Sequence, residues 1–280
     1  MTLAVGCADN SGDDYDEIDE RNAEIVDNLI EAGFSEDDIE IREAPVFSTD
    51  LILNESELQV FVEGDMHVTL EASRDMLDKG PESFRHWRTP GIVSPSNSTI
   101  CLAKATSAAG GFGSYVLTGA MQTGVNWANN NFNNVGGLSL NFKTGNASIS
   151  SSGQLSTSMT GCTDVIYIYK VNGGAGGSAG FPSGGAAYNQ VRLNSGLAGY
   201  TNNVHEHVAT HEVGHAIGLR HTDWQTRSSC GQNSNEGQSG ASQISGTPFQ
   251  TTNSIMAACF SGSSNGEFRG SDQNALSTLY

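Results

Sequence analysis

The sequence lacks long apolar runs and has few basic side chains. No apolar stretch approaches the roughly 18 residues that a membrane-spanning helix needs. The 280 residues include 13 Lys and Arg against 31 Asp and Glu, and the net charge of −18 makes nucleic acid a poor partner. The length allows one large domain or two modest ones. We therefore expect neither a transmembrane helix nor a nucleic-acid partner.

Glycine is scarce in the first part of the chain, where acidic residues are concentrated. Residues 1–88 hold 5 of the 34 glycines, with 24 acidic and 6 basic side chains. Residues 89–280 hold 29 glycines, with 7 acidic and 7 basic side chains. This contrast predicts two units with different roles. We place a tether at residues 1–17, a small acidic α/β unit at 18–78, a linker at 79–96 and a larger domain at 97–280.

The first residues resemble a lipoprotein signal. Residues 3–7, LAVGC, are similar to the lipobox of bacterial lipoproteins, in which a cysteine at the position of Cys7 becomes lipidated. Only six residues precede Cys7, too few for the apolar core of a signal peptide. Either the signal was trimmed, which we favour, or the likeness is accidental. We expect an extracellular or bacterial outer-membrane lipoprotein whose only membrane attachment is this lipid, followed by a polar tether.

The remaining four cysteines all lie in the glycine-rich part. An even number in an exported protein predicts disulfides. Four cysteines allow three connectivities, of which we favour Cys101–Cys162 with Cys230–Cys259. The alternative is free buried thiols in a cytoplasmic protein.

Hydrophobic periodicity predicts a mixture of helices and strands. Residues 18–44 begin as a helix and continue as loop, and residues 58–70 have strand character broken by Gly64. We expect Ser271 or Asp272 to cap the closing helix. The further expected strands are 99–105, 138–142, 164–169 and 190–193, the helices 115–130, 202–217 and 271–280, and the loops 173–187 and 224–253.

The most informative segment is HEVGHAIGLRH at residues 211–221. His211 and His215 are four residues apart, so a helix places both rings on one face. Gly218 can end that helix in a left-handed conformation, which lets His221 turn back as a third ligand. Three imidazoles around Zn²⁺ leave a fourth position open for water, and Glu212 lies where it can act as general base. The alternatives are a His-rich helix end without metal, and a structural zinc site.

Three nearby residues have other expected roles. His207 shares the ligand face, but Val208 follows it, so a zinc register using His207 would lack a base; we expect it to contact solvent or a loop. His205 is expected to be exposed. Asp223 is a candidate second-shell acceptor for a ligand imidazole or for a new amino terminus, against a solvated turn residue.

The order of elements resembles the metzincin metallopeptidases. Their methionine turn is matched by Met256, which lies 35 residues after His221. The HEVGH and HTDW segments, at 211–215 and 221–224, are more closely similar to the bacterial dual-action HEIGH metallopeptidases, with Val213 in place of Ile. Where some metzincins carry a Tyr oxyanion donor, this chain has Ala258. The resemblance implies an α+β domain with a twisted mixed sheet, zinc helix, methionine turn and C-terminal helix.

The resemblance also implies a secreted endopeptidase with one catalytic Zn²⁺. The ion lowers the pKa of a water molecule and polarises the scissile carbonyl, while Glu212 takes the proton and passes it to the leaving amine. Protein or peptide substrates are expected to lie extended along an edge strand formed by Phe181–Tyr188. We expect a monomer. No calcium site is predicted in loop 224–253.

A short element of the acidic unit suggests how such an enzyme is kept latent. Residues 62–65, VEGD, are similar to the F-x-G-D element of astacin pro-segments, with Val62 in place of Phe. The resemblance implies that Asp65 occupies the fourth zinc position, and that Gly64 lets the backbone approach closely. The alternatives are a β-turn on an unrelated domain and His67 as the blocking ligand. Residues 79–96 then contain the processing region.

Two rival functions remain at this stage. One is a surface lipoprotein that binds a protein or glycan and retains a non-catalytic structural zinc. The other is a narrow peptidase that matures a single partner protein. Glu212 favours an enzyme over a binding module, because a binding module has no need of a general base.

Overall fold

The computed structural model describes residues 20–47, 51–77, 87–89, 91–232, 242–248 and 251–280. Cys7, the expected tether and residues 79–86 of the expected linker lie outside the described residues. The α-helices are α1 (Glu20–Glu31), α2 (Leu70–Leu77), α3 (Gly119–Asn133), α4 (Asn202–Ala216) and α5 (Gly270–Leu279). The short 3₁₀ helices are η1 (Glu36–Asp38), η2 (Pro95–Asn97), η3 (Phe112–Tyr115), η4 (Ser195–Gly199) and η5 (Ser228–Cys230).

One mixed sheet runs through the molecule. Among the described residues it has nine strands, in the order β1-β2-β3-β9-β10-β8-β5-β6-β7. Strands β3 and β9 pair in parallel, as do β10 with β8, β8 with β5 and β5 with β6, and the other neighbours are antiparallel. The strands are β1 (Ile39–Phe47), β2 (Leu53–Val62), β3 (Met66–His67), β5 (Thr99–Ala108), β6 (Asn141–Ile149), β7 (Leu155–Thr157), β8 (Asp164–Val171), β9 (Gly177–Gly180) and β10 (Gln190–Asn194), while β4 (Trp87–Arg88) pairs with β11 (Ser242–Gln243).

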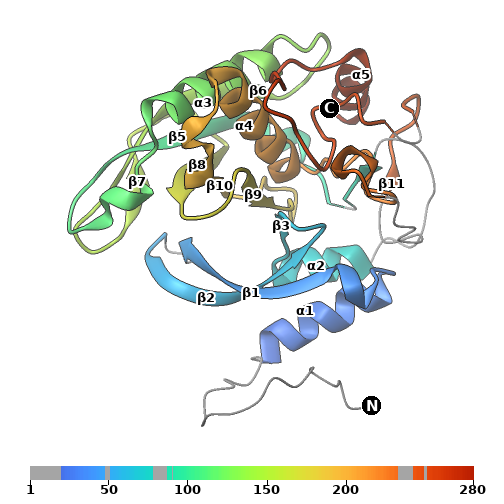
Figure 1. Cartoon of the computed structure of the whole chain (residues 1–280), viewed down its shortest axis with the longest axis horizontal. Coiled ribbons are helices and arrows are strands. Elements are labelled where there is room, and N and C mark those ends of the chain that lie inside the picture. Colours follow the sequence, from blue (N-terminus) through green and yellow to red (C-terminus); the bar gives the residue numbers. More distant parts are fainter. Residues whose placement is uncertain (1–19, 48–50, 78–86, 90, 233–241, 249–250) are drawn as a thin grey trace.

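The molecule has two parts, which we call the front unit (residues 20–77) and the main domain (residues 91–280). Figure 1 shows α1, α2 and β1–β3 of the front unit below, and α3, α4 and α5 above the strands of the main domain. The sheet continues from one part into the other through the β3–β9 pair. The α+β class and the mixed sheet are as predicted.

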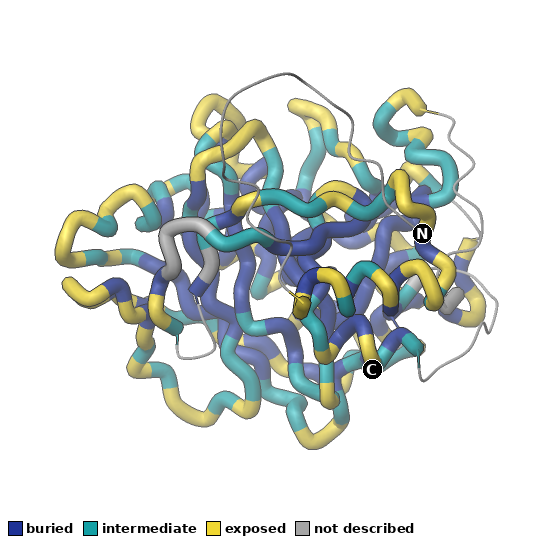
Figure 2. The backbone as a smooth tube through the Cα atoms, turned by 90° about the horizontal axis from the view of Figure 1, so that it is seen from below, coloured by how far each residue is buried: buried dark blue, intermediate teal, exposed yellow. Residues whose placement is uncertain are grey.

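Each part has an apolar core of its own, and the two parts share a third cluster. The largest cluster packs α3, α4 and α5 against the sheet and draws its buried residues only from positions 93–276. A second cluster joins α1 and α2 to β2 and takes one residue, Phe181, from the main domain. A third cluster packs Phe47 and Leu53 against the opposite face of the main sheet. Figure 2 shows the buried segments meeting in the interior, with exposed residues at the outer turns.

Three expected elements differ from the structure. The stretch expected as loop after α1 contains β1, whose Ile39 and Ile41 pack against the front core. The strand expected at 138–142 begins only at Asn141 and runs to Ile149. The closing helix begins at Gly270, and Asp272 lies inside its first turn, where its Oδ2 accepts a hydrogen bond from the backbone N–H of Arg269 at 2.8 Å.

Both disulfides join the predicted pairs. Cys101 of β5 is bonded to Cys162, just before β8, with a Cα–Cα distance of 5.6 Å. Cys230 of η5 is bonded to Cys259, three residues after Met256, with a Cα–Cα distance of 5.1 Å. The first bond ties a buried strand to a loop, and the second joins η5 to the loop after Met256.

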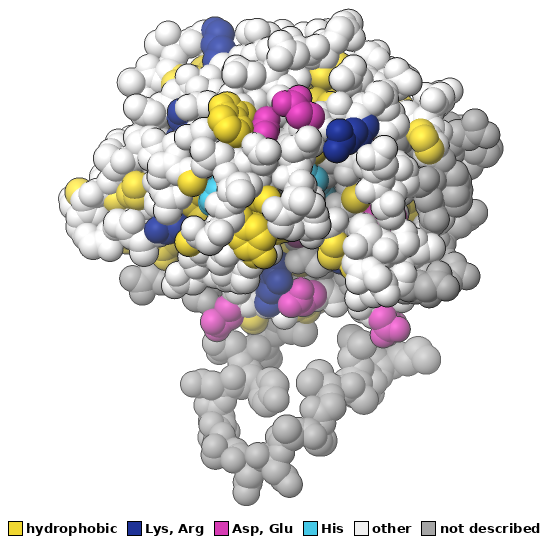
Figure 3. All heavy atoms as spheres, turned by 45° about the horizontal axis from the view of Figure 1, so that its top comes forward, with side chains coloured by type: hydrophobic (Ala, Val, Ile, Leu, Met, Phe, Trp, Pro, Cys, Tyr) yellow, Lys and Arg dark blue, Asp and Glu magenta, His cyan; other side chains and the backbone are white. Residues whose placement is uncertain are grey.

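Charged side chains are sparse on the outside of the main domain. Figure 3 shows a face on which a few acidic and basic side chains lie scattered among uncharged ones. None of the described helices is long and apolar enough to cross a membrane.

Candidate metal centre

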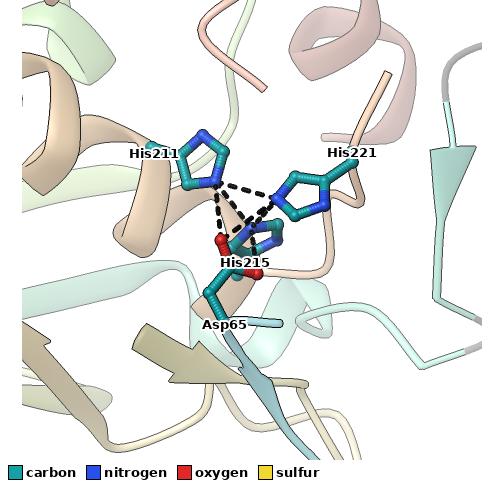
Figure 4. Close-up of side chains that lie close together, drawn as sticks. All are labelled: Asp65, His211, His215 and His221. Carbon is teal, nitrogen blue, oxygen red and sulfur yellow. Dashed lines mark hydrogen bonds and ion pairs between the residues drawn. The ribbon is translucent and has the colours of Figure 1, made fainter. Parts of the chain in front are cut away.

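Helix α4 and the turn after it bring three imidazoles together. His211 and His215 extend from one face of the helix, as their spacing predicts. Gly218 has φ +112°, a conformation that favours glycine, and the chain reverses there so that His221 returns to the same point. The three Nε2 atoms lie 2.9, 3.1 and 3.3 Å apart. Figure 4 shows the three rings pointing towards one another.

The outer nitrogens of the first two rings fix their tautomers. His211 Nδ1 lies 2.7 Å from the carbonyl oxygen of Ile255, and His215 Nδ1 lies 2.7 Å from that of Leu219. A carbonyl oxygen only accepts, so each Nδ1 carries the proton and each Nε2 directs a lone pair at the centre. Outer partners of this kind are usual for metal-binding histidines.

The third imidazole takes its outer partner from the front unit. His221 Nδ1 lies 3.0 Å from Oε2 of Glu63, and the other carboxylate oxygen of Glu63 pairs with Arg220. Glu63 is only 3% exposed and Arg220 only 1%. The front unit therefore places a buried carboxylate beside the third imidazole, within ion-pair distance of its Nδ1.

Asp65 faces the centre from the opposite side. Its carboxylate oxygens lie 3.2 Å from Nε2 of His221, 3.6 Å from that of His211 and 3.9 Å from that of His215. Burial raises the pKa of Asp65, but the basic nitrogens of His221 and His211 outweigh burial and hold the pKa well below its usual value. The carboxylate is therefore ionised, and its Oδ1 is buried without a hydrogen-bond partner.

This donor set fits a divalent cation. The four ligand atoms of Asp65, His211, His215 and His221 lie within 4.8 Å of one another. Tetrahedral ligands at about 2.0–2.1 Å from Zn²⁺ lie about 3.3 Å apart, which agrees with the spacing of the imidazole nitrogens. Three imidazoles and a carboxylate converge on one point, and such a set binds a divalent cation when the imidazoles are neutral.

The carboxylates are presented by a tight hairpin between β2 and β3. Val62 pairs with Met66, and between them Glu63 and Gly64 have φ +54° and +88°. A Cβ atom at position 64 would meet only Arg227, at 3.4 Å, so Gly64 is needed for its backbone conformation and not for the close approach predicted from the sequence. The hairpin directs Glu63 and Asp65 into the main domain.

Comparison with known proteins gives the family. A family model described as dual-action HEIGH metallo-peptidase matches residues 60–280. The chain belongs to this family. The match begins within β2, so it includes the hairpin with Glu63 and Asp65 as well as the whole main domain. No curated protein matches the chain.

Two solved structures of myroilysin show a weaker similarity. The first is 13% identical, with a TM-score of 0.38, and covers 68% of this chain and 82% of its own. The second is 13% identical, with a TM-score of 0.35, and covers 68% of this chain and 93% of its own. Family membership makes this chain a metallopeptidase, a hydrolase that acts on protein or peptide substrates.

The glutamate of the family motif lies buried beside the centre. Glu212 is 2% exposed, and its Oε1 lies 2.7 Å from where a Cβ atom at Gly177 of β9 would stand. Burial and then the charge of Asp65 raise its pKa well above the usual value, against the effects of His221 and Arg192. Its Oε2 is buried without a hydrogen-bond partner.

Met256, the expected turn methionine, lies against helix α4. A Cβ atom at Gly214 would lie 2.6 Å from the sulfur of Met256. The preceding residue, Ile255, supplies the carbonyl that accepts from His211. Asp223 ties this turn to η5, because it accepts from the N–H groups of Ala258 at 2.9 Å and Ser229 at 2.7 Å.

Asp223 is fully buried, so the interpretation as a solvated turn residue is wrong. Among the described residues, the acceptor beside Nδ1 of His221 is Glu63. His207 was expected to contact solvent or a loop. It contacts a loop, because its Nδ1 lies 2.9 Å from the carbonyl oxygen of Asn265. His205 was expected to be exposed and is buried, at 1%.

Two further expectations need correction. The edge strand that the front unit covers is β9, at Gly177–Gly180, and not Phe181–Tyr188. His67, the alternative blocking ligand, turns its Nδ1 to the hydroxyl of Tyr188 at 2.7 Å. Glu63 and Arg220 were not identified as functional from the sequence. Glu63 lies two residues before Asp65, and Arg220 directly precedes His221.

Proposed function

We propose that this metallopeptidase is a latent zinc endopeptidase, held inactive by Asp65 at the fourth position of the metal site. The observation that supports this proposal is the approach of the Asp65 carboxylate to three imidazole nitrogens at 3.2–3.9 Å. Imidazole and carboxylate donors in a tetrahedral set favour Zn²⁺. A carboxylate in that position leaves no place for the water that hydrolysis requires.

The residues of the main domain have distinct roles once Asp65 has left. The imidazoles of His211, His215 and His221 hold the ion, which when bound supplies Lewis acidity for the water and the scissile carbonyl. Glu212 takes a proton from the attacking water and returns it to the leaving amine. Burial and the charge of Asp65 both raise the pKa of Glu212. Departure of Asp65 removes the second cause, so a larger share of Glu212 is ionised at a given pH and can accept a proton from water.

The same hairpin blocks the edge strand. Met66 and His67 of β3 pair in parallel with Ala179 and Gly180 of β9, and the N–H of Ala179 donates to the carbonyl oxygen of Asp65 at 3.2 Å. We propose that an extended substrate takes this place and uses the backbone groups of β9. The front unit thus acts as a prodomain that excludes substrate and water together.

We also propose that the protein is exported. The two disulfides of the main domain support an oxidising compartment. Mass spectrometry of the protein isolated from its native cells would give the true N-terminus and any lipid on Cys7. A cytoplasmic protein with reduced thiols would contradict export.

The test compares Asp65→Asn with the unaltered full-length chain. Asparagine keeps the shape of the side chain but is a poor ligand for a cation, so water can displace it. Hydrolysis of a protein substrate should rise about tenfold for each 1.4 kcal/mol of blocking interaction that is lost. The matched control is Asp27→Asn in α1, which replaces an exposed aspartate of the front unit.

Two outcomes would contradict the proposal. If Asp65→Asn retains zinc but hydrolyses no faster than the unaltered chain, Asp65 is not the block. The double variant Asp65→Asn, Glu212→Gln should bind zinc and lose hydrolysis by about 10²-fold or more. Equal hydrolysis with and without Glu212 would overturn its role as the base.

A further inference from the structure

A second carboxylate site lies beside the metal centre. One oxygen of Glu63 pairs with the guanidinium of Arg220, and the other lies 3.0 Å from Nδ1 of His221. Both basic groups belong to the main domain, while the carboxylate belongs to the front unit. One nitrogen of a guanidinium and the outer nitrogen of an imidazole thus lie within ion-pair distance of a single carboxylate.

Neighbouring aromatic rings hold Arg220 in this orientation. Its guanidinium lies 5.4 Å from the ring of Trp224, in the main domain, and 4.8 Å from that of Phe34, in the front unit. Release of the front unit removes Glu63 and Phe34 together. Trp224 remains in place to orient the guanidinium.

We propose that Arg220 and the Nδ1–H of His221 form a subsite that binds an acidic side chain of the peptide substrate in the released enzyme. The inference rests on the proposed function, because it treats the hairpin as occupying the substrate's place. An arginine and an imidazole N–H are both hydrogen-bond donors, and the two oxygens of a carboxylate can accept from both. A glutamine has only one acceptor oxygen, and its NH₂ group would face a donor. In the full-length chain, the carboxylate of Glu63 occupies this subsite.

The hairpin also indicates where the acidic residue would stand in a substrate. Only Gly64 separates Glu63 from Asp65, which faces the metal ligands. The carboxylate site is therefore next to the position at which a peptide would be cleaved. The substrate class is a peptide with Glu or Asp close to the scissile bond.

The test begins with the folded full-length chain, cut in solution within residues 79–92. The large core uses only residues from position 93 onward, so the cut leaves it intact. The probes are pairs of quenched fluorescent peptides that differ only by Glu or Gln, placed in turn at each position on both sides of the cleaved bond. Amidated C-termini leave the side chain as the only carboxylate that differs within a pair.

At one position, the trimmed wild type should cleave the Glu peptide at least about tenfold faster than the Gln peptide, as expected for a charged hydrogen bond in a desolvated site. Arg220→Met should reduce this ratio to near one. The matched control is Arg227→Met, which removes another positive charge close to the hairpin, 3.4 Å from a Cβ atom at Gly64, and should keep the preference.

Equal cleavage of the Glu and Gln peptides by the wild type at every position would overturn the inference while leaving the peptidase assignment intact. A preference lost in Arg227→Met and kept in Arg220→Met would also overturn it. If no peptide is cleaved, the proposed function fails instead. In that case, binding of unquenched versions of the same peptides to the trimmed Glu212→Gln chain is measured by fluorescence polarisation. Tighter binding of the Glu peptide than of the Gln peptide would support the inference, and equal binding would overturn it.

Discussion

The front unit and the main domain bring opposite chemistry to one place. The main domain supplies imidazoles and a guanidinium, and the front unit supplies two carboxylates on one hairpin. The main domain has 7 acidic and 7 basic residues from position 89 onward, whereas the first 88 residues carry the entire net charge of −18. The difference teaches that the proposed latency would rest on charge complementarity at the site, added to the covering of an edge strand.

Removing a ligand from the main domain should have the largest effect. His215→Ala in the Asp65→Asn background should lose tightly bound zinc, and hydrolysis should fall by more than the about 10–100-fold loss typical of removing an outer partner. The measurements are metal content by elemental analysis and hydrolysis of a protein substrate. His205→Ala is the matched control, because it removes another buried imidazole from the same helix outside the metal site.

Stoichiometric zinc in His215→Ala would contradict the assignment of the metal ligands to the main domain. It would show that the imidazoles are not the ligands. Loss of zinc in His205→Ala to the same extent would show that both substitutions act through folding and not through coordination.

The two separate cores allow a smaller, more selective perturbation. Leu29 is fully buried in the front core and Leu276 is fully buried in the main core. Either Leu→Ala substitution should cost about 2–5 kcal/mol of the unfolding free energy of its own part. Leu29→Ala should therefore raise hydrolysis by the uncut chain, and Leu276→Ala should lower it.

Parallel assays of hydrolysis and thermal unfolding would check this pair. A rise in hydrolysis in both variants, or in neither, would mean that the two parts unfold as one unit. The front unit would then not be released separately from the main domain.

The sequence was sufficient to predict the metal centre because its geometry is local. The spacing of His211 and His215 sets their common face, and one glycine sets the return of His221. Helix α4 and the closing helix also followed from patterns within short segments. The even number of cysteines predicted disulfides but left three connectivities open, of which the favoured one is present. Asp65 was predicted through a four-residue resemblance, and the structure places it at the imidazoles.

The features that the sequence did not predict depend on contacts between distant segments. The Glu63–Arg220 pair joins positions 157 residues apart, and no periodicity relates them. Strand β9 has the sequence GSAG, which is typical of a loop, and it is extended because β10 and β3 pair with it on both sides. His205 was expected to be exposed, but α4 is covered on all sides from Val204 to Ala216.

The smallest expected effect concerns a contact across the boundary between the two parts. The hydroxyl of Tyr188, in the main domain, lies 2.7 Å from Nδ1 of His67, in the front unit. Burial raises the pKa of Tyr188 to about 12, from about 10 for an unburied tyrosine. The folded chain therefore keeps the phenol protonated at a pH where the unfolded chain ionises it.

This stabilisation is complete below pH about 10 and is lost as the pH rises to about 12, at a total cost of about 2–3 kcal/mol. Phenylalanine does not ionise, so Tyr188→Phe should show a shallower loss of unfolding free energy over this range, measured by urea denaturation at successive pH values. Tyr200→Phe, which replaces an exposed tyrosine, is the matched control. Identical profiles for Tyr188→Phe and the wild type would show that the phenol is not held in this buried contact, and that the boundary between the parts is open to water at Tyr188.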